Sequence, residues 1–164
     1  MSALALTAGE MLVWIEKDSK EWRRLVTTQP EVMAIPCDVM GASTAGELLR
    51  HIVVVELRYA QRLAGLPIAE YAEVVADSAE SLYATHDRAM ALYRQLLAAP
   101  DTDWEGTIEF MTQTQGKLRA SRRAIFFHAL LHSQRHYAQL ATLMRQHGVA
   151  TWGMDYLMVA AERV

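Results

Sequence analysis

The stretch that organises this chain reads His128-Ala-Leu-Leu-His132-Ser-Gln-Arg-His136-Tyr-Ala-Gln-Leu140. Its three histidines are four residues apart, and residues at that spacing lie on one face of an α-helix. Apolar residues continue this face before and after the row. Buried imidazoles without a partner are costly, and a metal ion is one partner that would satisfy them. The pattern therefore predicts a long helix that carries a candidate metal site.

The composition is that of an ordinary globular protein. The chain has 164 residues, a net charge of −3 and one cysteine, Cys37. This length suits one domain, spanning residues 1–164. The charge gives no reason to expect nucleic acid or a membrane surface as a partner. A single cysteine excludes an intramolecular disulfide and is consistent with a reducing compartment.

Two further features bear on where the protein resides. No stretch approaches the roughly 20 apolar residues that a membrane span needs. The segment Met1–Glu10 lacks the basic residues and long apolar run of a signal peptide. We therefore expect a soluble cytoplasmic protein.

Apolar periodicity predicts four amphipathic helices. They span approximately residues 8–27, 44–64, 78–98 and 122–147. Long connections separate the first helix from the second and the third from the fourth. Four such helices in one small domain indicate an all-α fold, a four-helix bundle with long connections.

Capping signals support these boundaries. Capping boxes are expected at Thr7 with Glu10 and at Thr44 with Glu47, because each pair can satisfy backbone amides of a first turn. Gly65 and Gly148 can close the second and fourth helices in the left-handed conformation. Asp77 and Ser121 are the expected N-caps of the third and fourth helices. Residues 104–118 are expected to form a long loop with a short extended piece.

A metal held by this helix needs a ligand from elsewhere. Two histidines at i and i+4 can bind one metal, and His51 is the best third candidate because it lies on the core side of the second helix. Three histidines and an open position form the ligand set of a catalytic zinc site. The alternative is that these histidines are packed core residues bonded to other side chains or to solvent.

The remaining polar candidates have simpler interpretations. Gln139 could bond a ligand or orient a substrate, and an interhelical hydrogen bond would explain it equally well. Glu47 lies one turn before His51 on the same helix. His147 is expected to cap its helix, and His86 to lie on a solvated face.

Several site classes lack their motifs. A di-iron bundle needs Glu-x-x-His twice and a zinc protease needs His-Glu-x-x-His, and neither motif occurs. There is no Cys-x-x-Cys and no glycine-rich phosphate loop. A small basic group at the start of the fourth helix is expected to be solvated or to receive an anionic substrate. It consists of Lys117, Arg119, Arg122 and Arg123.

Two stretches resemble the DinB/YfiT-like family of metal-dependent hydrolases and thiol transferases. Thr44-Ala-Gly-Glu-Leu-Leu-Arg-His51 resembles the motif that ends in the first metal histidine of that family. Residues 128–148 resemble its last helix, His-x3-His-x3-His-Arg-Gly-Gln-Leu, closing with Leu-Arg-x-x-Gly. The resemblance implies metal ligands at His51, His132 and His136, and leaves His128, Gln139 and Glu47 to support them or line a pocket. Tyr137 departs from it, because the family usually has arginine there.

The resemblance also implies an up-down-down-up arrangement of the helices, a homodimer and a divalent metal. Zinc or nickel is the expected metal, with iron or manganese as alternatives. Members of known activity use low-molecular-weight thiols. The first hypothesis is therefore a metal-dependent transferase or isomerase that uses a small thiol against an electrophilic small molecule, or a hydrolase that uses metal-activated water. The second is a non-catalytic, stress-related protein that binds metal or a small molecule.

Overall fold

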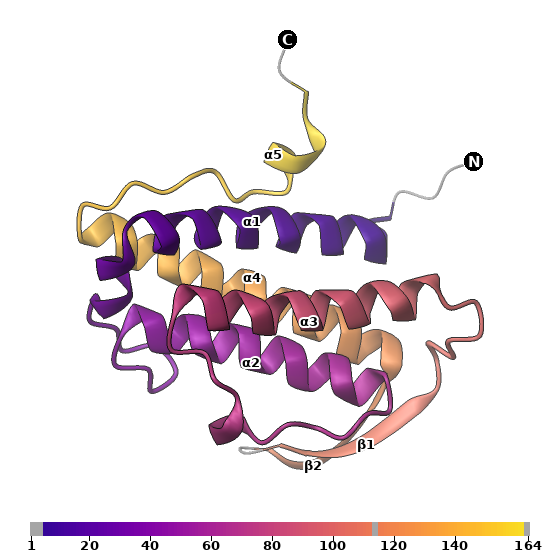
Figure 1. Ribbon diagram of the computed structural model, residues 1–164. Coiled ribbons are helices and arrows are strands. Elements are labelled where there is room, and N and C mark those ends of the chain that lie inside the picture. The colour runs from indigo at the N-terminus through magenta and orange to yellow at the C-terminus, as the bar shows by residue number, and fades with distance from the viewer. Residues whose placement is uncertain (1–4, 113–114, 163–164) are drawn as a thin grey trace.

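A computed structural model describes residues 5–112 and 115–162 of the chain (Figure 1). Residues 1–4, the start of the segment considered above for a signal peptide, lie outside this part. The described chain is mostly helical and contains one small antiparallel sheet. The long helices are α1 (Ala8–Thr28), α2 (Ala45–Leu63), α3 (Ala79–Ala98) and α4 (Arg122–Gln146). The short elements are η1 (Pro30–Ala34), η2 (Tyr71–Glu73), β1 (Thr107–Thr112), β2 (Gly116–Ser121) and α5 (Leu157–Ala160).

The four long helices lie side by side and enclose one apolar core (Figure 1). α2 packs against both α3 and α4, and α1 packs against the same two helices. The side chains that fill the core are Ile15, Trp22, Leu48, Ile52, Leu82, Tyr93, Leu130 and Leu140, all buried. Full burial of a large apolar side chain stabilises a fold by about 1.5–3 kcal/mol. Helix packing of this kind agrees with the predicted all-α class.

The predicted helix ends are mostly confirmed. Thr7 Oγ1 accepts from the Glu10 amide at 3.2 Å, and the Thr7 amide donates to Glu10 Oε2 at 2.7 Å, which completes the first capping box. Gly65 and Gly148 have φ angles of 67° and 74°, in the left-handed region that glycine adopts without steric cost. Ser121 caps α4 as expected.

Two caps differ from prediction. Ser78, not Asp77, is the N-cap of α3, because its side chain accepts from the Ser81 amide at 3.2 Å. Thr44 caps α2, but the Glu47 carboxylate bonds to the Ser43 amide at 2.6 Å rather than to the Thr44 amide. Both differences shift a hydrogen bond by one residue and leave the helix in place.

The short extended piece predicted within residues 104–118 is confirmed as β1, but the second strand, β2, was not predicted. β1 and β2 pair in antiparallel register from Thr107 with Ser121 to Thr112 with Gly116. Ile108 and Phe110 alternate with exposed residues of β1, as expected for a strand with one covered face. β2 is mostly exposed and carries no such alternation, so its sequence gives a weak strand signal. Gln113 and Thr114, within the predicted loop, lie outside the described residues.

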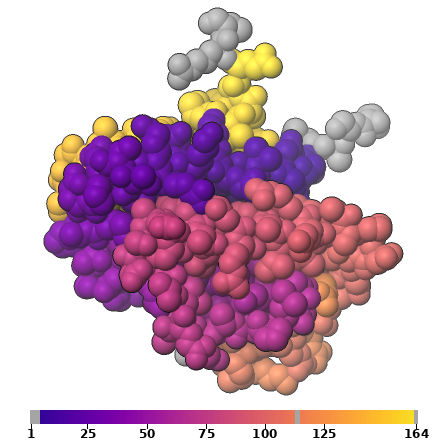
Figure 2. All heavy atoms as spheres, in the orientation of Figure 1, coloured from indigo at the N-terminus to yellow at the C-terminus, as the bar shows by residue number. Residues whose placement is uncertain are grey.

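The C-terminal segment returns over α1 (Figure 2). The Trp152 ring packs edge-on against Trp22 with centroids 4.8 Å apart, and its Nε1 donates to Asp18 Oδ1 at 3.1 Å. Trp14 Nε1 donates to the Met154 carbonyl at 2.7 Å. None of the helices in residues 5–112 and 115–162 is long and apolar enough to cross a membrane.

Candidate metal centre

Three imidazoles converge where α2 crosses the middle of α4. Nε2 of His132 lies 3.2 Å from Nε2 of His51 and 3.2 Å from Nε2 of His136. Nitrogens that bind one zinc tetrahedrally at ordinary Zn–N lengths are about 3.3 Å apart. The three side chains predicted to meet therefore do meet, at a separation that suits a common ion.

The helices give the three rings different surroundings. His132 and His136 occupy successive turns of α4 and are buried at 9% and 0% relative exposure, whereas His51 of α2 is half-buried. The triad therefore lies at the edge of the core, with its partly open side at His51. A position on that side is what a bound metal needs in order to accept another ligand.

Burial keeps all three imidazoles neutral at neutral pH. Desolvation is the main cause that lowers the pKa of His51 to about 4, assisted by His136 and Arg135. Desolvation, followed by the neighbouring histidines, lowers the pKa of His132 to about 2. The pKa of His136 is also lowered by burial. Neutral imidazole has the nitrogen lone pair that a metal requires.

The outer nitrogens of two rings have partners. His136 Nδ1 lies 2.6 Å from Gln139 Oε1, which can only accept, so the proton of this ring is on Nδ1 and its Nε2 carries a lone pair. The Tyr71 hydroxyl lies 3.4 Å from His51 Nδ1. His132 Nδ1 is buried, with no hydrogen-bond partner among the described residues.

This arrangement fits a cation better than it fits three free imidazoles. His132 Nε2 faces the Nε2 atoms of both His51 and His136. A neutral imidazole has at most one proton on Nε2, so it can donate to only one of these neighbours, and lone pairs then face each other at the remaining contact. A divalent cation would use all three lone pairs. Among the described residues, one group of three or more histidine, cysteine or carboxylate ligand atoms is close enough to share an ion, and it is this triad.

The connection between α2 and α3 brings Tyr71 to the site. The Arg50 guanidinium donates to the carbonyls of Tyr71 at 2.7 Å and Val74 at 3.2 Å. It also lies over the Tyr71 ring, 4.8 Å from its centroid. Arg50 directly precedes His51, so one helical turn of α2 carries both a triad histidine and the anchor for the residue that contacts it.

Arg135 is a second charged group at the site that the sequence did not indicate. Its guanidinium lies 3.3 Å from His136 Nε2, and it helps to lower the pKa of each triad histidine. It is exposed, so it can move when Nε2 takes another partner. The usual family arginine position is filled by Tyr137, which is buried and stacks on Trp22 with centroids 6.1 Å apart.

The supporting residues expected from the sequence fall into different places. Gln139 contacts the triad through His136. His128 is exposed, with its ring 6.0 Å from that of His132 and 5.4 Å from that of Tyr59. Glu47 bonds Ser43, and no contact with His51 is found for it among the described residues.

The expected solvated position of His86 is wrong. This side chain is buried at 4% relative exposure, and its Nδ1 lies 2.7 Å from Glu56 Oε2. The other carboxylate oxygen of Glu56 accepts from Ser133 Oγ at 2.7 Å. The polar neighbours Asp87 and Arg88 suggested an exposed position, but the partner that allows burial lies thirty residues away on α2.

The four basic side chains just before and at the start of α4 already have partners within the protein. Lys117 and Arg119 both pair with Glu109, and Arg123 pairs with Glu105 at 2.8 Å. Arg122 donates to the Leu63 carbonyl at 2.5 Å. These partners leave the group little capacity to receive an anionic substrate.

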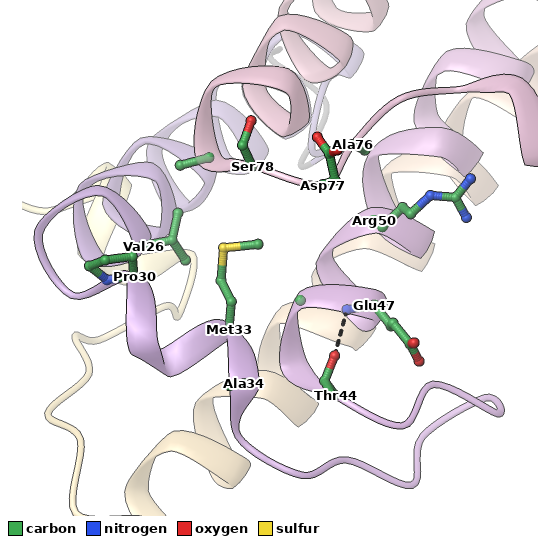
Figure 3. Close-up of a pocket in the computed structure, with 12 residues that line it drawn as sticks. Val26, Pro30, Met33, Ala34, Thr44, Glu47, Arg50, Ala76, Asp77 and Ser78 are labelled. Atoms are coloured by element: carbon green, nitrogen blue, oxygen red, sulfur yellow. Dashed lines mark hydrogen bonds between the residues drawn. The ribbon is translucent and has the colours of Figure 1, made fainter.

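A cavity of about 660 Å³ lies elsewhere, between the end of α1, η1 and the first turns of α2 and α3 (Figure 3). Its walls are mainly apolar, and Met33 projects into it from η1. Arg50 and Glu47 line its edge with their charged ends turned away. None of the three triad histidines lines this cavity, so it is separate from the candidate metal centre.

Comparison with known proteins identifies the family of this chain. The DinB family matches residues 1–163, which is nearly the whole chain. The chain therefore belongs to the DinB family. A comparison with curated proteins found no match.

Proposed function

We propose that this protein is a divalent-metal-dependent enzyme in which His51, His132 and His136 hold the metal. We further propose that it uses a low-molecular-weight thiol against an electrophilic small molecule, as a transferase or isomerase. The observation that carries the proposal is the convergence of three neutral imidazoles beside a half-buried side, with His132 Nε2 at 3.2 Å from the Nε2 atoms of both His51 and His136.

A divalent cation in this position would act as a Lewis acid and lower the pKa of a thiol or water bound to it. The ligand set of imidazoles suits zinc or nickel, and iron or manganese are alternatives. A thiolate is a strong nucleophile at neutral pH, so an epoxide or an activated alkene is the expected class of electrophile. A hydrolase that uses water instead is the closest variant.

The side chains around the triad have separate tasks in this proposal. Gln139 holds the His136 ring in the tautomer with a free Nε2. Tyr71 limits rotation of the His51 ring from the other side. Arg135, the nearest cation, would turn its guanidinium away from His136 and toward an anionic group on the open side.

The proposal includes the architecture and setting expected for the family. The four long helices would form an up-down-down-up bundle as one domain over residues 1–164. Two copies would pair as a homodimer in the cytoplasm. Exposed Leu157 and Met158, at 64% and 47% relative exposure, offer apolar surface that a second copy could cover.

The test is thiol-dependent turnover by metal-loaded protein. The protein is incubated with glutathione and an epoxide such as styrene oxide, and product is measured with and without a chelator. We expect product only when both metal and thiol are present, and little product from His132→Ala. His147→Ala is the control, because His147 is exposed at the end of α4, and it should retain most of the activity. Turnover that is indifferent to metal would contradict the proposal.

The second hypothesis, a non-catalytic binder, makes a different prediction in the same experiment. Metal would bind at the triad, but no thiol-dependent product would form with any of a panel of electrophiles. Substoichiometric metal in the purified protein would favour it as well.

A further inference from the structure

One arginine of α2 differs from the other two, Arg50 and Arg58, whose guanidinium groups donate to backbone carbonyls. The Arg62 side chain, in the last turn of α2, takes part in no hydrogen bond or ion pair with the described residues. Its guanidinium instead lies between two aromatic rings, 5.4 Å from the Tyr59 centroid and 4.7 Å from that of Phe110 in β1. The rings hold the guanidinium plane and leave its N–H groups free, as in a site prepared for a planar anion.

The position of Arg62 relates it to the triad. His51, Val55, Tyr59 and Arg62 recur at helical spacing, so they share one face of α2. All four are half-buried, so this face is partly open to solvent. On the facing helix, the exposed His128 lies between Tyr59 and His132, with ring centroids 5.4 Å and 6.0 Å from them. A continuous row of rings therefore leads from the triad to the Arg62 guanidinium.

The length of this row can be estimated from the helix. Eleven residues of α-helix separate His51 from Arg62, which is roughly 16 Å of axial rise. Helical side chains lean toward the N-terminus, and the stacking of Arg62 on Tyr59 shows this lean directly. The guanidinium lies at the level of the Tyr59 ring, and Tyr59 is eight residues after His51, so it lies roughly 12 Å from the triad along the helix. The metal–sulfur and guanidinium–carboxylate contacts take up part of this distance. Two extended residues, which span roughly 7 Å, cover the rest, so a tripeptide whose middle residue carries the sulfur is long enough.

Arg135 lies at the triad end of this row, 3.3 Å from His136 Nε2, and so cannot receive an anion at the far end. The other cations near the far end already have acceptors. Arg58 donates to the Ala69 carbonyl, and Arg122 to the Leu63 carbonyl. Partial burial lowers the pKa of Arg62, because it removes part of the water that stabilises the charge. A bound anion would stabilise the charge in place of that water. A single guanidinium matches one carboxylate, which it can bind with two parallel hydrogen bonds.

We propose that Arg62 binds a carboxylate of the small thiol whose sulfur lies at the triad, so that the thiol is a tripeptide-sized acid stretched along His128 and Tyr59. This rests on the proposed function. It predicts selectivity for acidic thiols over neutral thiols of the same size. It also assigns Arg62 a binding role beyond attaching the hairpin to α2.

The test uses cobalt-loaded protein, because a thiolate that binds Co²⁺ produces a charge-transfer absorption. Glutathione is titrated against its diethyl ester, which keeps the thiol and removes both carboxylates. We expect the ester to bind the parent about tenfold more weakly than the acid. Arg62→Met, which keeps a long apolar side chain between the rings, should weaken binding of the acid by about the same factor and leave the ester unchanged.

Two further variants sharpen the result. Arg62→Lys keeps the charge but loses the planar fork, and should recover part of the preference for the acid. Arg88→Met is the matched control, because Arg88 is exposed on α3 and its side chain bonds no described residue. It should bind both thiols as the parent does.

The outcomes separate this inference from the proposed function. Equal affinity for acid and ester, with a clear absorption from both, would overturn the Arg62 subsite alone. Equal weakening of both thiols in Arg62→Met would also overturn it, because the arginine would then be structural. Absence of the absorption with either thiol would contradict the thiol function and the subsite together.

Discussion

Two polar clusters that contain histidine lie between α2 and the helices packed against it, but their polar groups are satisfied in different ways. In one, the Glu56 carboxylate accepts a hydrogen bond from Ser133 Oγ and lies 2.7 Å from His86 Nδ1. All three side chains are buried. In the other, His51, His132 and His136 turn their Nε2 atoms toward one another with no carboxylate among them. The first cluster needs nothing further from outside. The second brings lone pairs together and would be completed by a cation.

The comparison distinguishes a structural histidine from a candidate ligand. Burial alone does not decide, because His86 and His136 are both buried. The decisive feature is the partner, since a buried polar group that already has an acceptor contributes to the fold. Glu56 joins α2, α3 and α4, and the triad joins α2 to α4 alone.

Removal of Glu56 should produce the largest effect on stability. Glu56→Ala leaves His86 and Ser133 buried without their acceptor, and we expect a loss of about 3–5 kcal/mol in the free energy of unfolding, measured by urea denaturation. Glu56→Gln keeps an acceptor and should lose less, while its metal content stays near that of the parent. Glu105→Ala, which removes an exposed ion pair, is the control and should change stability little. If Glu56→Gln folds but loses its metal, the claim that the Glu56 cluster serves the fold alone would be contradicted.

The second prediction concerns the metal-free protein in acid. The folded-state pKa values of His51 and His132 are lowered to about 4 and about 2, whereas unfolded histidine titrates near its ordinary value. The unfolded chain therefore binds more protons, and stability is lost as the pH falls below about 6.5. We expect a loss of about 2–4 kcal/mol by pH 4, after allowance for solvent around His51.

This acid sensitivity is checked by thermal unfolding from pH 7 to pH 4. The slope of stability against pH should be shallower in His132→Gln than in the parent, because one group with a lowered pKa has been removed. Parallel slopes would show that the triad is not the source.

A smaller effect is expected at Gln139. Gln139→Ala removes the acceptor that orients His136, and metal affinity should fall about tenfold, measured by competition with a chromophoric chelator. Gln139→Glu, which keeps an acceptor, should retain most of the affinity. The control is Gln95→Ala, an exposed glutamine on α3. An unchanged affinity in Gln139→Ala would mean that packing alone sets the His136 tautomer.

The smallest effect is expected at Tyr71. Its hydroxyl lies 3.4 Å from His51 Nδ1, at the long end of hydrogen bonding. Tyr71→Phe should therefore reduce metal affinity only about two- to threefold. A loss as large as that of a ligand variant would mean that the tyrosine acts on the metal directly.

The sequence was most informative where local rules decide the structure. Capping signals and apolar periodicity located the long helices, and the four-residue spacing in α4 placed two triad histidines on one face. His51 was found because its own helix turns it toward the core. β2 was missed because Gly116–Ser121 is mostly exposed and has no alternation of apolar residues.

The parts that were missed depend on contacts between distant segments. His86 is buried because it pairs with Glu56 on another helix, and the residues around position 86 do not predict that partner. Tyr71 reaches the site because Arg50 holds the connection after α2. Arg135 was the one recoverable case, because it lies one turn beyond His132 on the same helix.

The most direct test of the account is the metal content of the purified protein beside His51→Ala, His132→Ala and His136→Ala. We expect about one divalent ion per chain in the parent and a large loss in each variant, since each removes one of three protein ligands. His128→Ala should keep most of its metal, and circular dichroism should show that every variant remains helical. Metal content equal to that of the parent in all three ligand variants would contradict the metal centre.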